Sequence, residues 1–228
     1  MTESGVRRAS RPQDAVRLLF VLDRCGALCE STTDGAISQG EVAVVRGQKR
    51  LQALDFWLRN PDYLADELLT QVENGDADDA EWALAQAHML LEGDEPDVSR
   101  YPMLRWRFGA WEPLDDALAL LLSHGLIRVE AVGEPPAKVE RWDYYLLAAG
   151  RELALELRAD APDLAWYDER AVVVVAVAGQ RSGSQLKEIQ YRQAEYERTV
   201  WKDSISGITD RVRERLEQIT AQRVGAGA

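Results

Sequence analysis

The 228-residue sequence lacks features that mark several common protein classes. It contains no run of 18 apolar residues, so we expect no membrane-spanning helix and no membrane partner. The amino-terminal stretch MTESGVRRASRPQD has no apolar segment, so it does not match a secretory signal. Cysteine is limited to Cys25 and Cys29, too few for a disulfide framework. Together these absences predict a cytoplasmic protein with reduced thiols.

Residue types that carry catalysis are also scarce. His88 and His124 are the only histidines, and each stands alone on a predicted helical stretch. Cys25 and Cys29 have one-turn spacing on a predicted helix but no second pair, which favours buried small side chains over a zinc site. The GQRSGS segment at 179–184 lacks the ending of a phosphate-binding loop and favours a flexible link. We therefore predict no enzyme, no cofactor, and no catalytic or metal residue; a magnesium enzyme would need scattered carboxylates to converge in one cleft.

Charge is distributed unevenly along the chain. The net charge is −12, and residues 60–99, called the acidic block below, contain twelve acidic residues and no lysine or arginine. Because twelve is the whole excess, the rest of the chain is neutral by count. Such a block repels phosphate backbones. It is either a solvated helix face or an attachment surface for a basic partner, in which case Asp76, Asp78 and Asp79 are candidate interface residues.

The predicted fold class is mainly α with a small β-hairpin, and its first region, 12–99, is helical. One helix ends before Gly26. Two more cover VVRGQKRLQALDFWLRN and PDYLADELLTQVENG and are separated at Pro61, which suits the first turn of a helix. A further helix begins after clustered aspartates and ends at Gly93. The intervening CESTTDGAISQG is predicted to be a loop.

The second region, 100–160, has a different pattern. MLRWRFGAW alternates and predicts a short strand, and EPLDDALALLLSHG predicts a helix with four leucines, including Leu122, on one stripe. LIRVEAVG and WDYYLLAAG predict two strands joined by a hairpin tip, and RELALELRA opens another helix. This order resembles the winged-helix family, so we predict a central winged-helix module.

A winged helix that reads DNA needs cations on its recognition helix or wing. Helix 113–124 carries two acids and His124 but no lysine or arginine, and its wing has as many acids as bases. The best candidates for a phosphate contact are Arg105 and Arg107, which alternate with the core candidates Trp106 and Phe108. We therefore predict that this module does not read DNA. Nearby Trp111 is a candidate interface anchor.

The third region, 161–228, is predicted to be a long C-terminal helical arm. Val172 to Val175 form a β-branched run, but the preceding pattern favours a helix through 171–178. Residues 184–224 lack proline and place apolar residues near helical spacing, with Gly207 weakening the middle. The arm packs on its own core or on a partner. In the second case its interface candidates are Tyr191, Tyr196 and Trp201.

Three segments together resemble a known family. They are LQALDFWLRNPDYLADELL, YPMLRWRFGAWEPLDDALALLLSHGLI and GRELALELRADAPDLAWYDERA. Over residues 15–178 the chain is similar to the middle component of bacterial ABC-three-component systems, related to the small third subunit of Lamassu-type anti-phage complexes. The resemblance implies a non-catalytic subunit that bridges an SMC-like ATPase and an effector such as a nuclease, and that meets DNA only through the complex. The alternative is a winged-helix transcriptional regulator.

Overall fold

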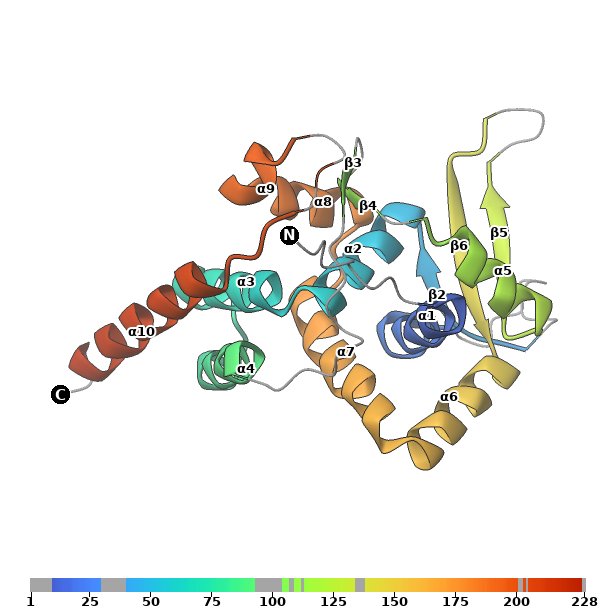
Figure 1. The fold of residues 1–228 in the computed structure, drawn as a ribbon, viewed down its shortest axis with the longest axis horizontal. Helices are drawn as coiled ribbons and strands as arrows, with labels where there is room; N and C mark the ends of the chain where they lie inside the picture. Colours follow the sequence, from blue (N-terminus) through green and yellow to red (C-terminus); the bar gives the residue numbers. More distant parts are fainter. Residues whose placement is uncertain are drawn as a thin grey trace, which may run out of the picture.

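Helices surround one small sheet in the fold of this protein (Figure 1). The computed structural model describes residues 10–29, 40–92, 104–106, 109–111, 113–133, 138–200, 203 and 205–226. Helices account for most of these residues, which confirms the mainly α class. The helices are α1 (Arg11–Cys25), α2 (Gln48–Arg59), α3 (Pro61–Asn74), α4 (Ala80–Glu92), α5 (Asp115–Ser123), α6 (Ala148–Asp160), the 3-10 helix η1 (Pro162–Leu164), α7 (Ala165–Ala178), α8 (Gly183–Tyr191), α9 (Ala194–Arg198) and α10 (Thr209–Ala226).

The strands of the described residues form two antiparallel sheets. The larger sheet has the order β1-β2-β6-β5, so the early strand β2 lies beside the late strand β6. The predicted hairpin is confirmed as β5–β6. MLRWRFGAW is not the single strand predicted, because its described residues form a separate two-stranded hairpin, β3–β4. The strands are β1 (Ala27–Leu28), β2 (Glu41–Arg46), β3 (Leu104–Trp106), β4 (Gly109–Trp111), β5 (Ile127–Val132) and β6 (Arg141–Leu147).

Strand β2 is the main error of the sequence analysis, which placed Val44 and Val45 in a helix. Both side chains are buried, because α1 and α2 pack on this part of the sheet. A strand covered on both faces shows no alternation of apolar and polar residues, so its pattern resembles that of a helix. Gly47 follows with φ of +89°, a backbone conformation that separates the strand from α2. The boundary between α2 and α3 at Pro61 is as predicted.

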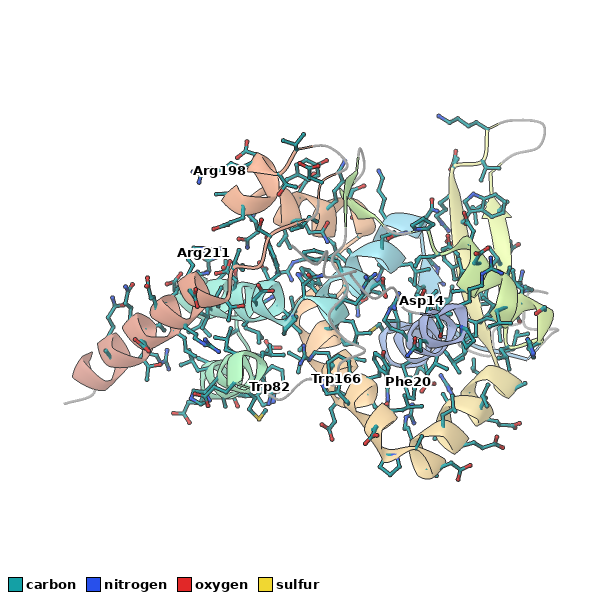
Figure 2. All side chains as sticks on the ribbon, in the orientation of Figure 1. Asp14, Phe20, Trp82, Trp166, Arg198 and Arg211 are labelled. Carbon is teal, nitrogen blue, oxygen red and sulfur yellow. The ribbon has the colours of Figure 1, made fainter. Side chains whose placement is uncertain are left out.

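Helix α1 lies at the centre of the core. Five consecutive residues, Leu18 to Leu22, are buried, because α2, α5, α6 and α7 contact different sides of this helix. The ring of Phe20, which Figure 2 labels, stacks on Tyr167 of α7 with centroids 5.9 Å apart. One hydrophobic cluster includes residues from all three regions of the sequence analysis. The amino-terminal, central and C-terminal segments therefore share one hydrophobic core.

A buried ion pair joins α1 to α2 within this core. Asp55 is fully buried and accepts a hydrogen bond from Arg17 Nε at 2.6 Å, while Arg59 Nη1 lies 3.5 Å from its other oxygen. Removing one partner from a buried pair leaves an uncompensated charge, which is more costly than losing an exposed pair. The pair thus fixes the orientation of α2, whose first turn lines the candidate site.

The C-terminal segment predicted as a helical arm is divided into several helices. It forms α8, α9 and α10, and Ile205 to Ile208 are not helical. The interruption is stabilised by Asp62 of α3, whose Oδ2 accepts a hydrogen bond from the Ile208 amide at 2.6 Å. Helix α10 then packs along α3 and α4 (Figure 1). The preceding helix α7 spans 165–178 as predicted, because Val173, Val174 and other valines are buried by α1, α2 and α3.

Two smaller predictions are also wrong. Cys29 is not on the helix of Cys25, because α1 ends at Cys25 and the chain turns into β1 at Gly26. A Cβ at Gly26 would lie 2.5 Å from the Leu22 carbonyl oxygen, which explains the glycine at this close turn. Leu122 is 44% exposed rather than on the buried stripe, because its helix face points away from α1 and the sheet.

Candidate functional site

The predicted interface aspartates lie between α3 and α4. Asp76, Asp78 and Asp79 are all exposed, but they do not have the same role. Asp79 Oδ1 accepts a hydrogen bond from the Trp82 amide at 2.9 Å and so stabilises the start of α4. Asp76 and Asp78 do not take part in this cap, so their side chains can contact another molecule while the cap stays intact.

The aromatic and arginine candidates are described unevenly. Tyr191 is half-buried, with Lys187 Nζ 4.9 Å from its ring centroid. Only the backbone of Arg105, Trp111 and Tyr196 is described, and Arg107 and Trp201 lie outside the described residues. The interface and phosphate contacts assigned to these five residues therefore remain predictions.

Part of the acidic block faces the C-terminal helix instead of solvent. Asp66 is buried and accepts hydrogen bonds from Arg215 Nη1 at 2.7 Å and Gln193 Nε2 at 2.7 Å. Arg215 also pairs with Glu73, and Arg211 lies 3.3 Å from Asp66. Both interpretations of this block are thus incomplete, because two of its acids, Asp66 and Glu73, are paired with arginines of the same chain.

One cleft on the described surface is lined largely by cations, and we call it the basic cleft. It has a volume of about 840 Å³ and lies where α2 begins, between the α7–α8 connection and the β5–β6 hairpin (Figure 1). Its lining contains one acidic residue, Glu140. The cations that line it are Arg46, Lys49, Arg50, Lys138, Arg141 and Arg181.

Close backbone contacts build the floor of the basic cleft. Gly183 lies against α2, because a Cβ there would be 2.5 Å from the Arg50 nitrogen. Arg50 donates hydrogen bonds to the carbonyl oxygens of Gly179, at 2.9 Å, and of Arg181. On the opposite side the Gly47 amide donates to the Trp142 carbonyl at 3.0 Å. These bonds hold three segments that are distant in sequence around one hollow.

The electrostatics of the basic cleft favour an anion. The hydrogen-bond partners of Arg50 are neutral carbonyl oxygens, which do not compensate its positive charge. Burial lowers the pKa of this arginine. Arg46, Lys49 and Lys138 are exposed, whereas Arg141 is paired with the buried Asp143 at 2.9 Å. Helix α2 has no acidic residue in its first turn and no side-chain cap. The positive end of its dipole therefore adds to the charge of the side chains.

A second hollow extends the basic cleft along α8. Its volume is about 640 Å³, and it shares Lys49 and Ser184 with the basic cleft. It adds Lys187 and Arg192 to the cations and Glu188 to the acids. Among the described residues, eight cations and two acids thus line these two adjoining hollows, on a chain whose net charge is −12. A concave surface of one sign concentrates ligands of the opposite sign.

The metal-ligating side chains and the two histidines do not gather in this way among the described residues. They contain no group of three or more histidine, cysteine or acidic side chains that could hold a metal ion. His88 lies 3.2 Å from Glu92, and His124 Nδ1 lies 2.9 Å from the Leu120 carbonyl, so both make contacts within their own helical segments. None of the helices in the described ranges is long and apolar enough to cross a membrane.

Sequence reasoning missed the basic cleft because its cations come from separate segments. The wing was judged neutral from its own residues, and the GQRSGS segment was interpreted only as a link. A usable signal was present in lysine: three of the four lysines, Lys49, Lys138 and Lys187, line this surface. No protein-family model, curated protein or solved structure matches the chain.

Proposed function

We propose that this protein is a non-catalytic accessory subunit that binds the phosphate backbone of a nucleic acid in the basic cleft. The observation that carries the proposal is the gathering of eight cations around two adjoining hollows on a chain with a net charge of −12. Each phosphate that a lysine or arginine neutralises releases counterions, which favours binding at low salt. The two hollows follow one another along α2 and α8, which suits a linear chain of phosphates.

The proposed binding can be compared with the elements of the predicted winged-helix module. Helix α5 directly precedes the β5–β6 hairpin, and α6 follows it, which is the order that the sequence predicted. The exposed face of α5 carries Asp115 and Asp116, of which Asp116 pairs with Arg11 at 2.9 Å, and the helix has no lysine or arginine of its own for a phosphate. The basic cleft lies instead at the α2 side of the hairpin. The nucleic acid would therefore contact the wing and α2 and leave α5 free.

The family resemblance supplies the partners of the proposal, an SMC-like ATPase and an effector subunit of an anti-phage defence complex. Direct binding in the basic cleft would replace the indirect DNA contact that the resemblance implies. The exposed Asp76 and Asp78 lie away from the cleft, between α3 and α4, and are available to a basic partner. One chain could then hold nucleic acid on one surface and a protein on another.

Charge reversal tests the nucleic-acid part of the proposal. Fluorescence anisotropy of a labelled oligonucleotide would be measured at low salt for the wild type and for Arg46→Glu/Lys49→Glu. We expect at least a tenfold loss of affinity and a shallower dependence on salt, because two phosphate contacts are lost. The matched control is Arg198→Glu/Arg223→Glu, which makes the same change in net charge at exposed positions of α9 and α10 (Figure 2 labels Arg198). Equal losses in both variants would refute a localised site.

Co-purification tests the partner. A tagged copy would be expressed with its neighbouring genes, and the co-eluting proteins identified by mass. Recovery of a large coiled-coil ATPase, reduced by Asp76→Lys/Asp78→Lys, is the expected result. Asp79 stays unchanged in this variant because it caps α4. Recovery of the chain alone would refute the adaptor function, and unchanged recovery with the variant would show that these aspartates are solvated.

A further inference from the structure

We propose that the basic cleft takes single-stranded nucleic acid and that Trp142 stacks on one of its bases. This inference rests on the proposed function and names its ligand more narrowly. The tryptophan lies on β6, next to Arg141, and lines the basic cleft with the cations. An aromatic face beside a track of cations is the combination that binds single strands.

The position of Trp142 on the sheet explains why its ring is available. Trp142 shares a face of β6 with Tyr144 and Leu146, which are both buried, whereas Trp142 is 43% exposed. Tyr144 and Leu146 thus pack in the core, whereas Trp142, on the same face of the strand, lies beyond the edge of the core. Its cross-strand neighbour on β5 is Ala131, and the residue bonded to its carbonyl from the β2 side is Gly47. Neither neighbour has a side chain large enough to cover an indole.

The backbone of Trp142 is nevertheless held firmly. Its carbonyl accepts the Gly47 amide at 3.0 Å, and its strand lies between β2 and β5 in the sheet. A large apolar side chain on a fixed backbone loses little freedom when a flat partner stacks on it. The exposed cations Lys49 and Lys138 line the same cleft, where they can pair with the phosphates on either side of the stacked base.

The shape and charge of the surface favour a single strand over a duplex. The basic cleft is a concave hollow of about 840 Å³, within the size range of pockets that enclose small molecules. A duplex keeps its bases stacked on one another and can offer one to Trp142 only by extruding it. Helix α5, the element that would enter a major groove, presents Asp115 and Asp116. A single strand can bend its phosphates along Lys49 and the second hollow instead.

The test compares three ligands and three proteins by fluorescence anisotropy. The ligands are a labelled oligothymidylate, an abasic strand of the same length and a duplex of the same length; the proteins are the wild type, Trp142→Ala and Trp142→Phe. We expect the wild type to bind oligothymidylate about tenfold more tightly than the abasic strand, since one stacked base contributes that much. Trp142→Ala should remove this difference, Trp142→Phe should retain part of it, and abasic binding should not change. Thermal unfolding of each variant checks that the fold persists.

Several results would overturn the inference, and they differ from failure of the proposed function. Equal wild-type affinity for the oligothymidylate and abasic strands, or equal weakening of both by Trp142→Ala, would exclude stacking while the phosphate site stands. Tighter binding of the duplex would exclude the single-strand preference. If no strand binds at low salt, or if polyglutamate binds more tightly and in a manner sensitive to Arg46→Glu/Lys49→Glu, the proposed function itself is wrong and the cleft serves an acidic protein.

Discussion

The buried carboxyl of Glu67 on α3 gives a stability prediction with a definite sign. The residue is 6% exposed, and burial, opposed by the charges of Arg181, Arg192 and Arg215, raises its pKa to about 7 from the ordinary value of 4.5. The folded state therefore holds the proton more tightly than the unfolded state does. Stability is greatest while the group is protonated and is lost as the pH rises from about 4.5 to about 7. At 1.36 kcal/mol for each pH unit, the full loss is about 3 kcal/mol.

Replacing this carboxyl by a neutral amide removes the loss. Glu67→Gln should be more stable than the wild type by about 2–3 kcal/mol near pH 8 and nearly equal to it near pH 4.5, when the free energies of unfolding are measured in urea. Taking the difference between variant and wild type at each pH cancels the other titrating groups. Glu156→Gln, at an exposed position of α6, is the control and should show no such dependence. A difference that is independent of pH, or a less stable variant near pH 8, would refute the reasoning.

Three further predictions concern packing and thiol chemistry. Gly183→Ala should destabilise the protein by about 1–3 kcal/mol in urea unfolding, because the new Cβ would lie 2.5 Å from a backbone nitrogen of α2; Gly225→Ala, with open space around it, should not. Leu54→Ala should cost about 2–5 kcal/mol in the same measurement, because the side chain is fully buried, and a cost below ~1 kcal/mol would mean that this core is loosely packed. A thiol reagent should modify Cys29 in the native protein and reach Cys25 only after unfolding, because Cys25 is buried and burial raises its pKa to about 12.

The helices that the sequence predicted correctly are those with local signals at their ends. Pro61 begins α3, and Gly26 follows α1, so backbone chemistry alone marks these boundaries. Strand β2 has no such signal, because its partner β6 is distant in the chain and both of its faces are covered. The break before α10 likewise depends on Asp62, a residue of α3 that no local pattern connects to Ile208.

The basic cleft was missed for the same reason, because its residues are brought together only by the fold. Charge counted along the chain gave a neutral wing and a neutral C-terminal region, and both counts are correct. What matters for a ligand is that Lys49, Lys138 and Arg181 meet in one hollow while many of the acids face elsewhere or are paired. Tertiary structure thus separates charges that are mixed in the sequence, and net charge then says little about what one surface binds.

The arginines of α10 form ion pairs with acids of the acidic block, and acids paired in this way are not available to another protein. Arg215 donates to the buried Asp66 at 2.7 Å, whereas Arg211 is more exposed and lies 3.3 Å from the same carboxylate. Arg215→Met should therefore cost about 2–3 kcal/mol in urea unfolding, and Arg211→Met about 1 kcal/mol or less. Costs of about 1 kcal/mol or less in both variants would mean that these ion pairs do not hold α10 in place. With the expected inequality, α3 uses its buried acids to bind the arm of its own chain, and the exposed aspartates between α3 and α4 stay available to an outside partner.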